Sequence, residues 1–321
     1  MLNIIPYAPA SKMPAADMKR ERMICMKCKN RNFLVFLPLF FPRLTIMILF
    51  DNHNHSQFSF DGKRTTVEDS TRAAMSIELG GLCFSDHCDH YVPPMKNLFT
   101  DVVPEYFDVT LQQEEISRVQ DMLGDRIRIL KGIEIGMYED CHEEIRKVLT
   151  ENTFDQVIAS VHYIEQTDPY YGSYYEGKDW REAYGKYLET IHREMTWLED
   201  FDIMGHYDYI VRYASYPKSS ILYRDFSDIF DEIFRYLIHE GKALEINTKS
   251  YEGYRGRTVG LDNDVLLRYR EMGGEIISLG SDSHEPSRVG AGFMRHAEHL
   301  KSLGFRWTAH YEKRQLVQLP L

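Results

Sequence analysis

The stretch TIMILFDNHNHSQFSFDG, residues 45–62, joins an apolar run to a cluster of possible metal ligands. The run at 45–50 is typical of a buried β-strand. His53 and His55 follow it two residues apart, and Asp61 comes six residues later. Residues two apart on a strand point to the same side, so this histidine pair can bind one ion. The stretch decides the fold if other predicted strands end in similar side chains.

Composition limits the classes of function. The chain has 321 residues, of which 43% are hydrophobic, and a formal net charge of -11. This length suits one large α/β domain or two ordinary ones, and either buries a substantial core. The acidic balance disfavours nucleic acid as a partner, because phosphates attract basic surfaces. It remains compatible with a small anionic substrate held by a few local arginines.

The cysteines do not form a disulfide framework. They are odd in number and scattered, at positions 25, 28, 83, 88 and 141. This usage predicts a reducing compartment, which we expect to be the cytoplasm. Cys25 and Cys28 form a lone C-x-x-C motif, whereas a zinc ribbon needs a second such pair. We therefore expect no metal role for them.

Residues 1–46 differ from the rest of the chain. Basic residues precede an apolar stretch, which is the pattern of a signal peptide or a membrane anchor. Pro38 and Pro42 interrupt that stretch, so it offers no uninterrupted apolar span of about 18 residues. We expect a disordered or extraneous leader rather than an anchor. We also expect the functional domain to begin at Met47 and to cover residues 47–321.

From residue 45 onward, short runs rich in Ile, Val and Leu alternate with longer amphipathic segments. The predicted strands are 45–50, 82–85, 127–135, 156–161, 202–204, 243–247 and 275–279. The predicted helices are 66–79, 104–123, 179–199, 226–240, 262–272 and 294–303. Alternating strands and helices indicate βαβ units in a parallel sheet, either open or closed into a barrel. Seven strands of this kind favour a barrel.

Side chains able to bind metals occur in or just beyond the carboxyl end of each predicted strand. Glu245 and Asn247 fill this place in 243–247. At the other strands the candidate ligands are His53, His55, Asp61, His87, Glu134, His162, His206, Asp282 and His284. In parallel barrels these ends face one rim, where active sites are built. Imidazole and carboxylate suit zinc, manganese or iron. Nine ligands exceed what one tetrahedral ion uses, so we expect two or three divalent ions.

The ordered motifs DNHNH, FSDH, GIEIG, ASVH, MGHYD and LGSDSH resemble the PHP (polymerase and histidinol phosphatase) superfamily of metal-dependent phosphoesterases. The resemblance covers about residues 47–305, and FSFDG, SVHYI and EINTKS look most like monofunctional histidinol-phosphatases. It implies a distorted (β/α)7 barrel with a trinuclear metal centre at the carboxyl ends of the strands. It also implies hydrolysis of L-histidinol phosphate to L-histidinol and phosphate, a step of histidine biosynthesis.

The resemblance also divides the nine candidate ligands into three sets. The first ion would be held by His53, His55, Glu134 and Asp282. The second would be held by Glu134, His162 and His206, with Glu134 as the bridge. The third would be held by Asp61, His87 and His284. Of these residues, the ones expected to act in catalysis are Glu134, Asp282 and His284.

A phosphate ester fits such a site. Clustered dications neutralise phosphate oxygens and lower the pKa of bound water, to roughly 7 on a single zinc. Neither a G-x-S-x-G motif nor a complete phosphate-loop motif, G-x-x-x-x-G-K followed by Ser or Thr, occurs, consistent with hydrolysis without a covalent phosphoenzyme. Phosphate also needs a cation outside the metal cluster. We expect this role of Arg212 and Arg255, and the further candidates are Lys249, Arg257 and Arg288.

Other features leave alternatives open. The tyrosine-rich segment 168–180 is either a lid over the substrate or a loop that packs its own tyrosines. Asp86, Asp89 and Glu165 lie close enough in sequence to the predicted rim to contact a cationic substrate. The substrate could instead be another small phosphomonoester or phosphotyrosine. A metal-binding protein without turnover is the non-enzymatic alternative. No membrane partner is expected, and the sequence does not fix the oligomeric state.

Overall fold

The computed structural model describes residues 26–28, 31–33, 48–91, 106–254 and 256–321. Arg255, Cys25 and the first residues of the predicted strand at 45–50 lie outside the described residues. The chain divides into two compact units, residues 1–46 and 47–321. In the first unit, β1 (Met26–Cys28) and β2 (Arg31–Phe33) pair antiparallel. Within the described ranges, no helix has the length and apolar character needed to cross a membrane.

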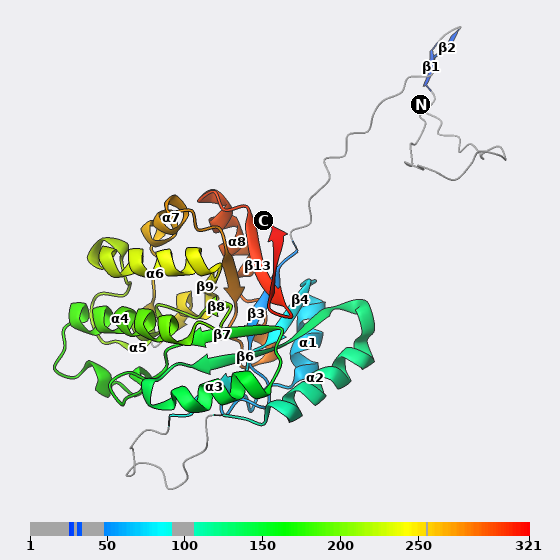
Figure 1. Ribbon diagram of the computed structural model, residues 1–321. Helices are drawn as coiled ribbons and strands as arrows, with labels where there is room; N and C mark the ends of the chain where they lie inside the picture. Colours follow the sequence, from blue (N-terminus) through cyan, green and yellow to red (C-terminus); the bar gives the residue numbers. More distant parts are fainter. Residues whose placement is uncertain (1–25, 29–30, 34–47, 92–105, 255) are drawn as a thin grey trace. The chain divides into compact units, whose positions relative to one another are not determined.

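The second unit is built around seven parallel strands in one curved sheet (Figure 1). They are β3 (Phe50–Asn54), β4 (Gly81–Phe84), β6 (Arg128–Gly136), β7 (Gln156–Ser160), β8 (Ile203–Met204), β9 (Ala243–Asn247) and β12 (Ile277–Gly280). Each strand pairs with the next of this series, and the short β5 (His87–Cys88) adds a parallel pairing to β6. Seven strands were predicted, and the structure has them in this order.

The sheet curls so that its first strand lies beside its last parallel one. A single parallel bridge joins Asn54 of β3 to Ser283, three residues beyond β12. The His55 amide donates to the Ser283 carbonyl at 2.8 Å. The Asn52 side chain donates to the Leu279 carbonyl at 3.1 Å. The unit is therefore a distorted (β/α)7 barrel, because an irregular contact stands where a full ladder would close the cylinder.

The first strand lies later in the sequence than its apolar run suggests. We expected it to end at Phe50, but β3 begins there and continues through Asn54. Phe50 pairs with Gly81, and Asn54 pairs with Phe84. All five residues of β3 are buried, polar ones included, and His53 near its carboxyl end faces Glu134 in the site. His53 therefore lies within the strand and does not follow it.

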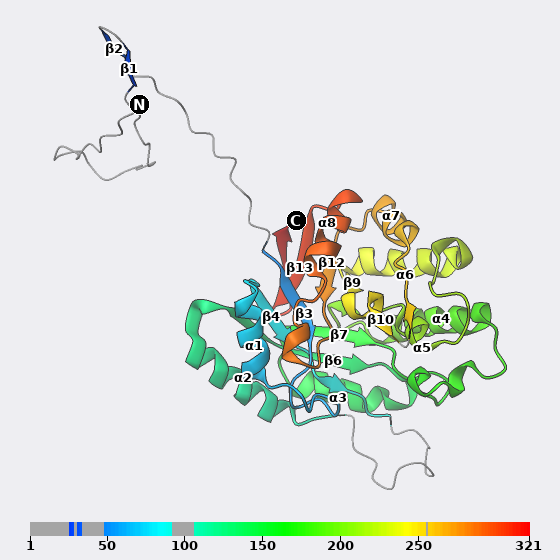
Figure 2. The same cartoon turned by 180° about the vertical axis from the view of Figure 1, so that it is seen from behind.

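Helices cover the outside of the sheet, as Figures 1 and 2 show from opposite sides. Six match predicted helices: α1 (Val67–Ser76), α2 (Val109–Leu123), α4 (Trp180–Leu198), α6 (Ser227–Glu240), α7 (Asn263–Glu271) and α8 (Phe293–Ser302). The structure also has α3 (His142–Glu151) and α5 (Tyr209–Tyr213), which the sequence did not predict. In α3 only Ile145 is fully buried, and the partly buried Val148 and Leu149 complete a short apolar face three to four residues along.

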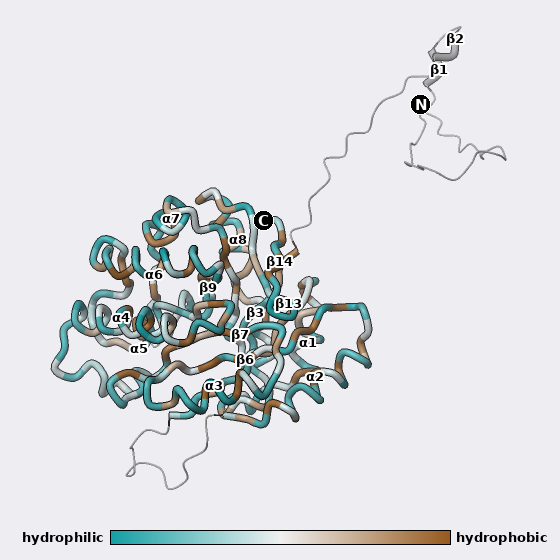
Figure 3. The backbone as a smooth tube through the Cα atoms, in the orientation of Figure 1, coloured by the Kyte–Doolittle hydropathy of each residue, from teal (hydrophilic) through white to brown (hydrophobic). Residues whose placement is uncertain are grey.

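Amphipathic faces hold the helices to the barrel. In Figure 3 hydrophobic and hydrophilic residues alternate along α6. Its buried side chains are Phe230, Ile233, Phe234 and Leu237, three to four residues apart. Each such side chain contributes about 1.5–3 kcal/mol when fully buried. α6 ends at Gly241, whose φ of 66° is the left-handed conformation that glycine adopts without a steric penalty.

A C-terminal hairpin occupies the end of the barrel opposite the candidate ligands. It consists of β13 (Trp307–Glu312) and β14 (Gln315–Pro320) and was not predicted. β13 pairs with β12 through Ala309 and Ser278. The His310 ring stacks on Phe50, the first residue of β3, at a centroid distance of 4.1 Å. The hairpin therefore fills the amino ends of the strands and leaves their carboxyl ends free for the site.

Candidate metal centre

The carboxylate of Glu134 lies at the centre of the site and is fully buried on β6. Its Oε2 lies 2.9 Å from Nδ1 of His87 and 3.1 Å from Nε2 of His53. Its Oε1 lies 3.1 Å from Nε2 of His206 and 3.3 Å from Nε2 of His162. Nε2 of His55 lies 3.6 Å from the same Oε2, so imidazoles from four different strands meet at one carboxylate and face both of its oxygens.

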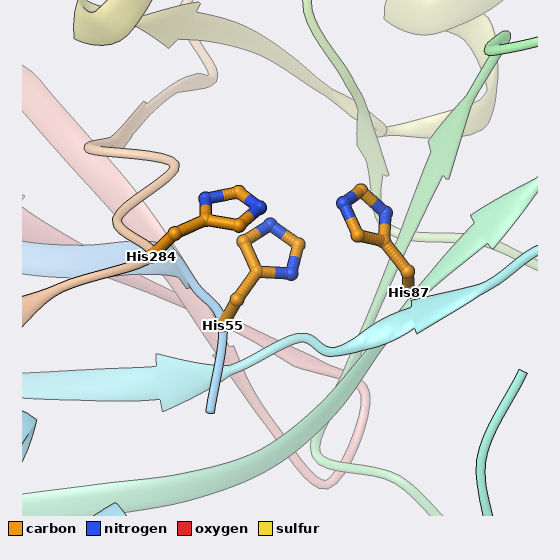
Figure 4. A group of neighbouring side chains, drawn as sticks. All are labelled: His55, His87 and His284. Carbon is orange, nitrogen blue, oxygen red and sulfur yellow. The ribbon is translucent and has the colours of Figure 1, made fainter. Parts of the chain in front are cut away.

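His55 and His284 extend this cluster. Figure 4 shows their rings lying against each other, with His87 facing them. The His55 centroid is 4.1 Å from that of His284 and 4.1 Å from that of His87. Nε2 of His55 also lies 3.3 Å from Oδ1 of Asp282, and Nε2 of His284 lies 2.8 Å from Oδ2 of Asp61. All nine predicted ligands thus lie around one site.

The structure groups these residues differently from the expected sets. Ligand atoms within 4.8 Å of one another form four groups: His53, His55 and Glu134; Glu134, His162 and His206; His55, His87 and His284; His87, Asp89 and His162. The second is the expected bridged set. Asp282 and Asp61 are in none of the four, and His55 accompanies His87 and His284 in the third. Asp61 lies at the rim with its side chain 39% exposed, 3.9 Å from His87.

The donor atoms of this cluster fit divalent metal ions. Five of them are buried and have no hydrogen-bond partner in the described part of the chain: Nε2 of His53, Nε2 of His55, Nδ1 of His87, Nδ1 of His206 and Oε2 of Glu134. A buried polar atom left unpaired costs about 1–3 kcal/mol. A cation placed among these atoms would engage their lone pairs. Imidazole nitrogen and carboxylate oxygen are ordinary zinc ligands.

Backbone features bring these side chains together. Asp282 follows β12 with a φ of 48°, in the left-handed region that Asp and Asn enter more readily than most residues. Such a conformation costs on the order of 1–3 kcal/mol and requires support from its surroundings. Gly280, two residues earlier, makes room for the site. A Cβ there would lie 2.2 Å from Oε1 of Glu245 and 2.6 Å from Cβ of His53.

The cluster also shifts the pKa values of its own groups. Burial alone would raise the pKa of Glu134, but the surrounding histidines hold it well below its usual range. Burial would lower the pKa of His53, but Glu134 and Glu245 raise it well above its ordinary value. Burial, together with the neighbouring His284 and His87, lowers the pKa of His55 well below its ordinary value. Without metal, protons are therefore held on some of the imidazoles around an ionised carboxylate.

Two outer carboxylates each hold the far nitrogen of one histidine of the cluster. Oδ1 of Asp89 lies 3.0 Å from Nδ1 of His162, and Oε1 of Glu245 lies 2.7 Å from Nδ1 of His53. We had considered Asp89 as a substrate contact, but its side chain is buried and directed at His162. The sequence signal for both was their place at a strand end beside a predicted ligand.

Comparison with known proteins identifies the family. The sequence pattern of the PHP domain matches residues 51–249. The histidinol-phosphatase of Lactococcus lactis subsp. lactis (strain IL1403) is 34% identical over 262 residues, which are 81% of this chain and 93% of that protein. This chain belongs to the PHP family.

Solved structures share the fold of this PHP domain. The crystal structure of histidinol phosphate phosphatase from Lactococcus lactis subsp. lactis Il1403, complexed with zinc, L-histidinol and phosphate, is 30% identical to it. It superposes with a TM-score of 0.75 and covers 84% of this chain and 98% of that one. A structure from Listeria monocytogenes, at 18% identity and a TM-score of 0.64, covers 77% of this chain and 99% of its own. That second likeness bears on the fold alone.

Two predicted cations of the PHP domain lie beside Asp282. Nζ of Lys249 is 3.0 Å from its Oδ1, and Nη1 of Arg212 is 3.7 Å from its Oδ2. Lys249 is partly exposed, whereas Arg212 is buried and also donates to Ser250. The other candidates have different partners, since Arg257 donates to main-chain carbonyls and Arg288 pairs with Glu252. The guanidinium of Arg255 lies outside the described residues.

Part of the tyrosine-rich segment 168–180 of the PHP domain is buried and packed against neighbouring helices. Tyr174 donates its hydroxyl to the Ala183 carbonyl at 2.6 Å, and Tyr175 donates to the Ile210 carbonyl at 2.7 Å. Tyr170 and Tyr171 are exposed instead, at 44% and 52%. This arrangement agrees with a loop that packs its own tyrosines, and only the exposed pair could contact a ligand.

The remaining acidic candidates also have internal partners. Asp86 is buried and accepts from the Ser56 hydroxyl at 2.8 Å and the Ser59 hydroxyl at 2.8 Å. It therefore fixes the loop that follows β3. Glu165 pairs with Lys178 at 2.8 Å and with Lys186 at 2.9 Å. Neither carboxylate is directed at the histidine cluster.

Proposed function

We propose that this PHP protein is a metal-dependent phosphomonoesterase, a histidinol-phosphatase that hydrolyses L-histidinol phosphate to L-histidinol and phosphate. The proposal rests on one convergence. At the carboxyl ends of the strands, histidine rings face both carboxylate oxygens of Glu134. The 30%-identical relative of the same fold was crystallised with zinc, L-histidinol and phosphate. The reaction is a step of histidine biosynthesis.

Two or three divalent ions, with zinc the first candidate, would occupy this site. Glu134 would bridge two of them, because its two oxygens face different histidines. His53 and His55 would hold one ion with Asp282, and His162 and His206 would hold another. The third would be held by Asp61, His87 and His284. When bound, the ions would act as Lewis acids that neutralise the charge of the phosphate oxygens and lower the pKa of a bound water.

The residues of the chain then have to orient the ester and move one proton. In the reaction, the bond between phosphorus and the histidinol oxygen breaks and a bond from phosphorus to a water oxygen forms. One proton of that water ends on the histidinol oxygen. Asp282 and His284 can carry it, because they lie 3.4 Å apart at the partly exposed side of the cluster. Glu134 and the buried histidines exclude bulk water from the inner side.

Cations of the chain would bind the phosphate. Arg212 and Arg255 are proposed from the sequence, and the position of Lys249 beside Asp282 adds it to them. The Lys249 side chain is 29% exposed, so the site is open to a phosphate oxygen at this residue. An ionised donor forms stronger hydrogen bonds to phosphate than a neutral one.

The test combines metal analysis with phosphate release. Purified protein should contain two to three equivalents of zinc, manganese or iron. It should release phosphate from L-histidinol phosphate with a kcat/KM far above that for p-nitrophenyl phosphate or a phosphotyrosine peptide. Preference for either of the latter two would point to another phosphomonoester or to phosphotyrosine as the substrate. Release from none of them by fully metallated protein would favour a metal-binding protein without turnover.

A further inference from the structure

Glu245 is a buried carboxylate beside the histidine cluster that belongs to none of the predicted ligand sets. It lies on β9, between β8 and β12, and its exposure is 1%. Both of its oxygens have a partner at short distance. Oε1 lies 2.7 Å from Nδ1 of His53, and Oε2 accepts a hydrogen bond of 2.7 Å from the backbone amide of His206.

The first contact fixes the ring of His53. Glu245 is on the Nδ1 side of that ring, and Nε2 on the opposite side lies 3.1 Å from Oε2 of Glu134. When Nδ1 donates its proton to the outer carboxylate, the lone pair of Nε2 is left for a metal. This Nε2 is one of the buried atoms without a hydrogen-bond partner among the residues described.

The second contact places a ligand on the other side of Glu134. The amide of His206 follows β8, and the ring of the same residue puts Nε2 at 3.1 Å from Oε1 of Glu134. One carboxylate therefore holds two histidines that face opposite oxygens of the proposed bridge. It reaches one through the ring and the other through the main chain.

The surroundings of Glu245 are fitted to this position. A Cβ on Gly280 would lie 2.2 Å from its Oε1, so the neighbouring strand can carry only glycine at that point without displacing it. Asn247 lies on the same strand, and its side-chain amide is 3.5 Å from Oε2 of Glu245 and 3.3 Å from Oδ2 of Asp282. Through Asn247, the carboxylate of Glu245 is thereby linked to Asp282, which follows β12.

We infer that Glu245 is a positioning residue that couples the two metal sites on either side of Glu134. It fixes the tautomer of His53 and the main-chain position of His206, and it contacts neither substrate nor metal. Both of its oxygens are occupied by these contacts, and they lie behind His53 as seen from Glu134. The inference rests on the proposed metal centre.

The experiment measures zinc affinity and zinc content in the full chain, independently of turnover. Metal-free wild type, Glu245→Gln and Glu245→Ala are titrated with zinc against a chromophoric chelator, and bound zinc is counted by elemental analysis. Loss of an outer carboxylate typically weakens metal binding by about 10–100-fold. Glu245→Ala should show this loss and fewer zinc ions per chain. The zinc affinity of Glu245→Gln should lie between those of wild type and Glu245→Ala, because its single carbonyl oxygen can keep only one of the two contacts.

Asp202→Asn is the matched control. Asp202 is a buried carboxylate directly before β8, at the amino ends of the strands and away from the site, where it accepts from the Val157 amide at 2.8 Å. Asp202→Asn should lower the unfolding temperature of metal-free protein but leave zinc affinity and content unchanged. The same pattern in both Glu245 variants would mean a purely structural role and would overturn the inference. If Glu245→Ala does not fold, Glu245→Gln alone decides between these outcomes.

Failure of the metal centre itself gives a different result. Wild-type protein that binds no zinc, manganese or iron would overturn the proposed function and this inference together. Wild type that binds two or three ions, with variants that bind them equally well, would overturn the role of Glu245 alone.

Discussion

Nζ of Lys249 lies 3.0 Å from Oδ1 of Asp282. The same Nζ is 3.1 Å from Nδ1 of His284, so one ammonium contacts two of the residues proposed to act in catalysis. Lys249 holds the pKa of Asp282 down, although burial would raise it. The ammonium therefore both keeps this carboxylate ionised and offers a donor to an anionic substrate.

Replacing this ammonium should weaken substrate binding. A hydrogen bond to a charged group contributes about 1.5–3 kcal/mol. We expect Lys249→Met to raise KM for L-histidinol phosphate by roughly tenfold or more, with protein stability little changed. Steady-state kinetics measure the effect. Lys186→Met is the control, because Lys186 pairs with Glu165 and Glu182 away from the cluster. Equal kinetics in both variants would remove Lys249 from the substrate site.

Arg255 is predicted to bind phosphate from its sequence context alone. We expect Arg255→Ala to raise KM for a phosphomonoester severalfold or more while leaving the fold intact. The measurement is the same steady-state assay, with circular dichroism to check folding. Arg255 has no role in the site if KM and kcat both stay at their wild-type values.

The bridging role of Glu134 predicts a larger effect. In Glu134→Gln, an amide nitrogen replaces one carboxylate oxygen. The amide nitrogen can neither accept a hydrogen bond from the histidines it faces nor bind a metal ion as the carboxylate oxygen would. A direct ligand should matter more than an outer-shell group, whose loss costs about 10–100-fold. We therefore expect a fall in kcat greater than this, with fewer zinc ions per chain. Elemental analysis and phosphate release measure the two effects.

Glu194→Gln is the matched control for this substitution. Glu194 is likewise a buried carboxylate facing a histidine, with Oε2 at 2.8 Å from Nε2 of His142, but it lies on α4 away from the site. Its zinc content and kcat should match those of wild type. A Glu134→Gln protein that keeps full zinc content and activity would contradict the proposed bridge.

Much of the fold and most of the site could be predicted because the relevant signals are local. Apolar runs mark the parallel strands, and a ligand at the end of each strand needs only the barrel topology to reach the others. His53 and Asp282 were therefore found although they lie 229 positions apart in the sequence. Their convergence follows from the parallel order of the strands.

The partition of the ligands depends on distances that no local pattern carries. Asp61 lies 3.9 Å from His87 and 2.8 Å from His284 at the rim, whereas the His55 ring lies directly against the rings of both His87 and His284. Glu245 was recognised as a candidate, but its role follows from the strands on either side of it. The C-terminal hairpin was missed because its strand β14 alternates exposed and half-buried residues and contributes little to the core.

The pH dependence of metal binding should follow from the protons held by the metal-free cluster. Burial would lower the pKa of His87, but Glu134 and Asp61 raise it to about 9. Zinc can bind Nδ1 only after a proton has left the ring. Below pH 9 the apparent zinc affinity should therefore fall by about tenfold per pH unit for this proton alone. Chelator competition at pH 6, 7 and 8 measures the slope, and an affinity independent of pH would contradict it.

The stability of the metal-free protein should fall as pH rises, whereas its zinc affinity should increase. A histidine whose pKa is raised in the folded state stabilises it fully below the unfolded pKa, near 6.5, and this contribution is lost as pH rises through about 9. Metal-free protein should therefore lose stability from His87 between pH 6.5 and 9, while zinc binding strengthens over the same range. The difference in unfolding temperature between zinc-loaded and metal-free protein should grow with pH. A difference that shrinks toward pH 9 would mean that His87 does not exchange its proton for a metal ion.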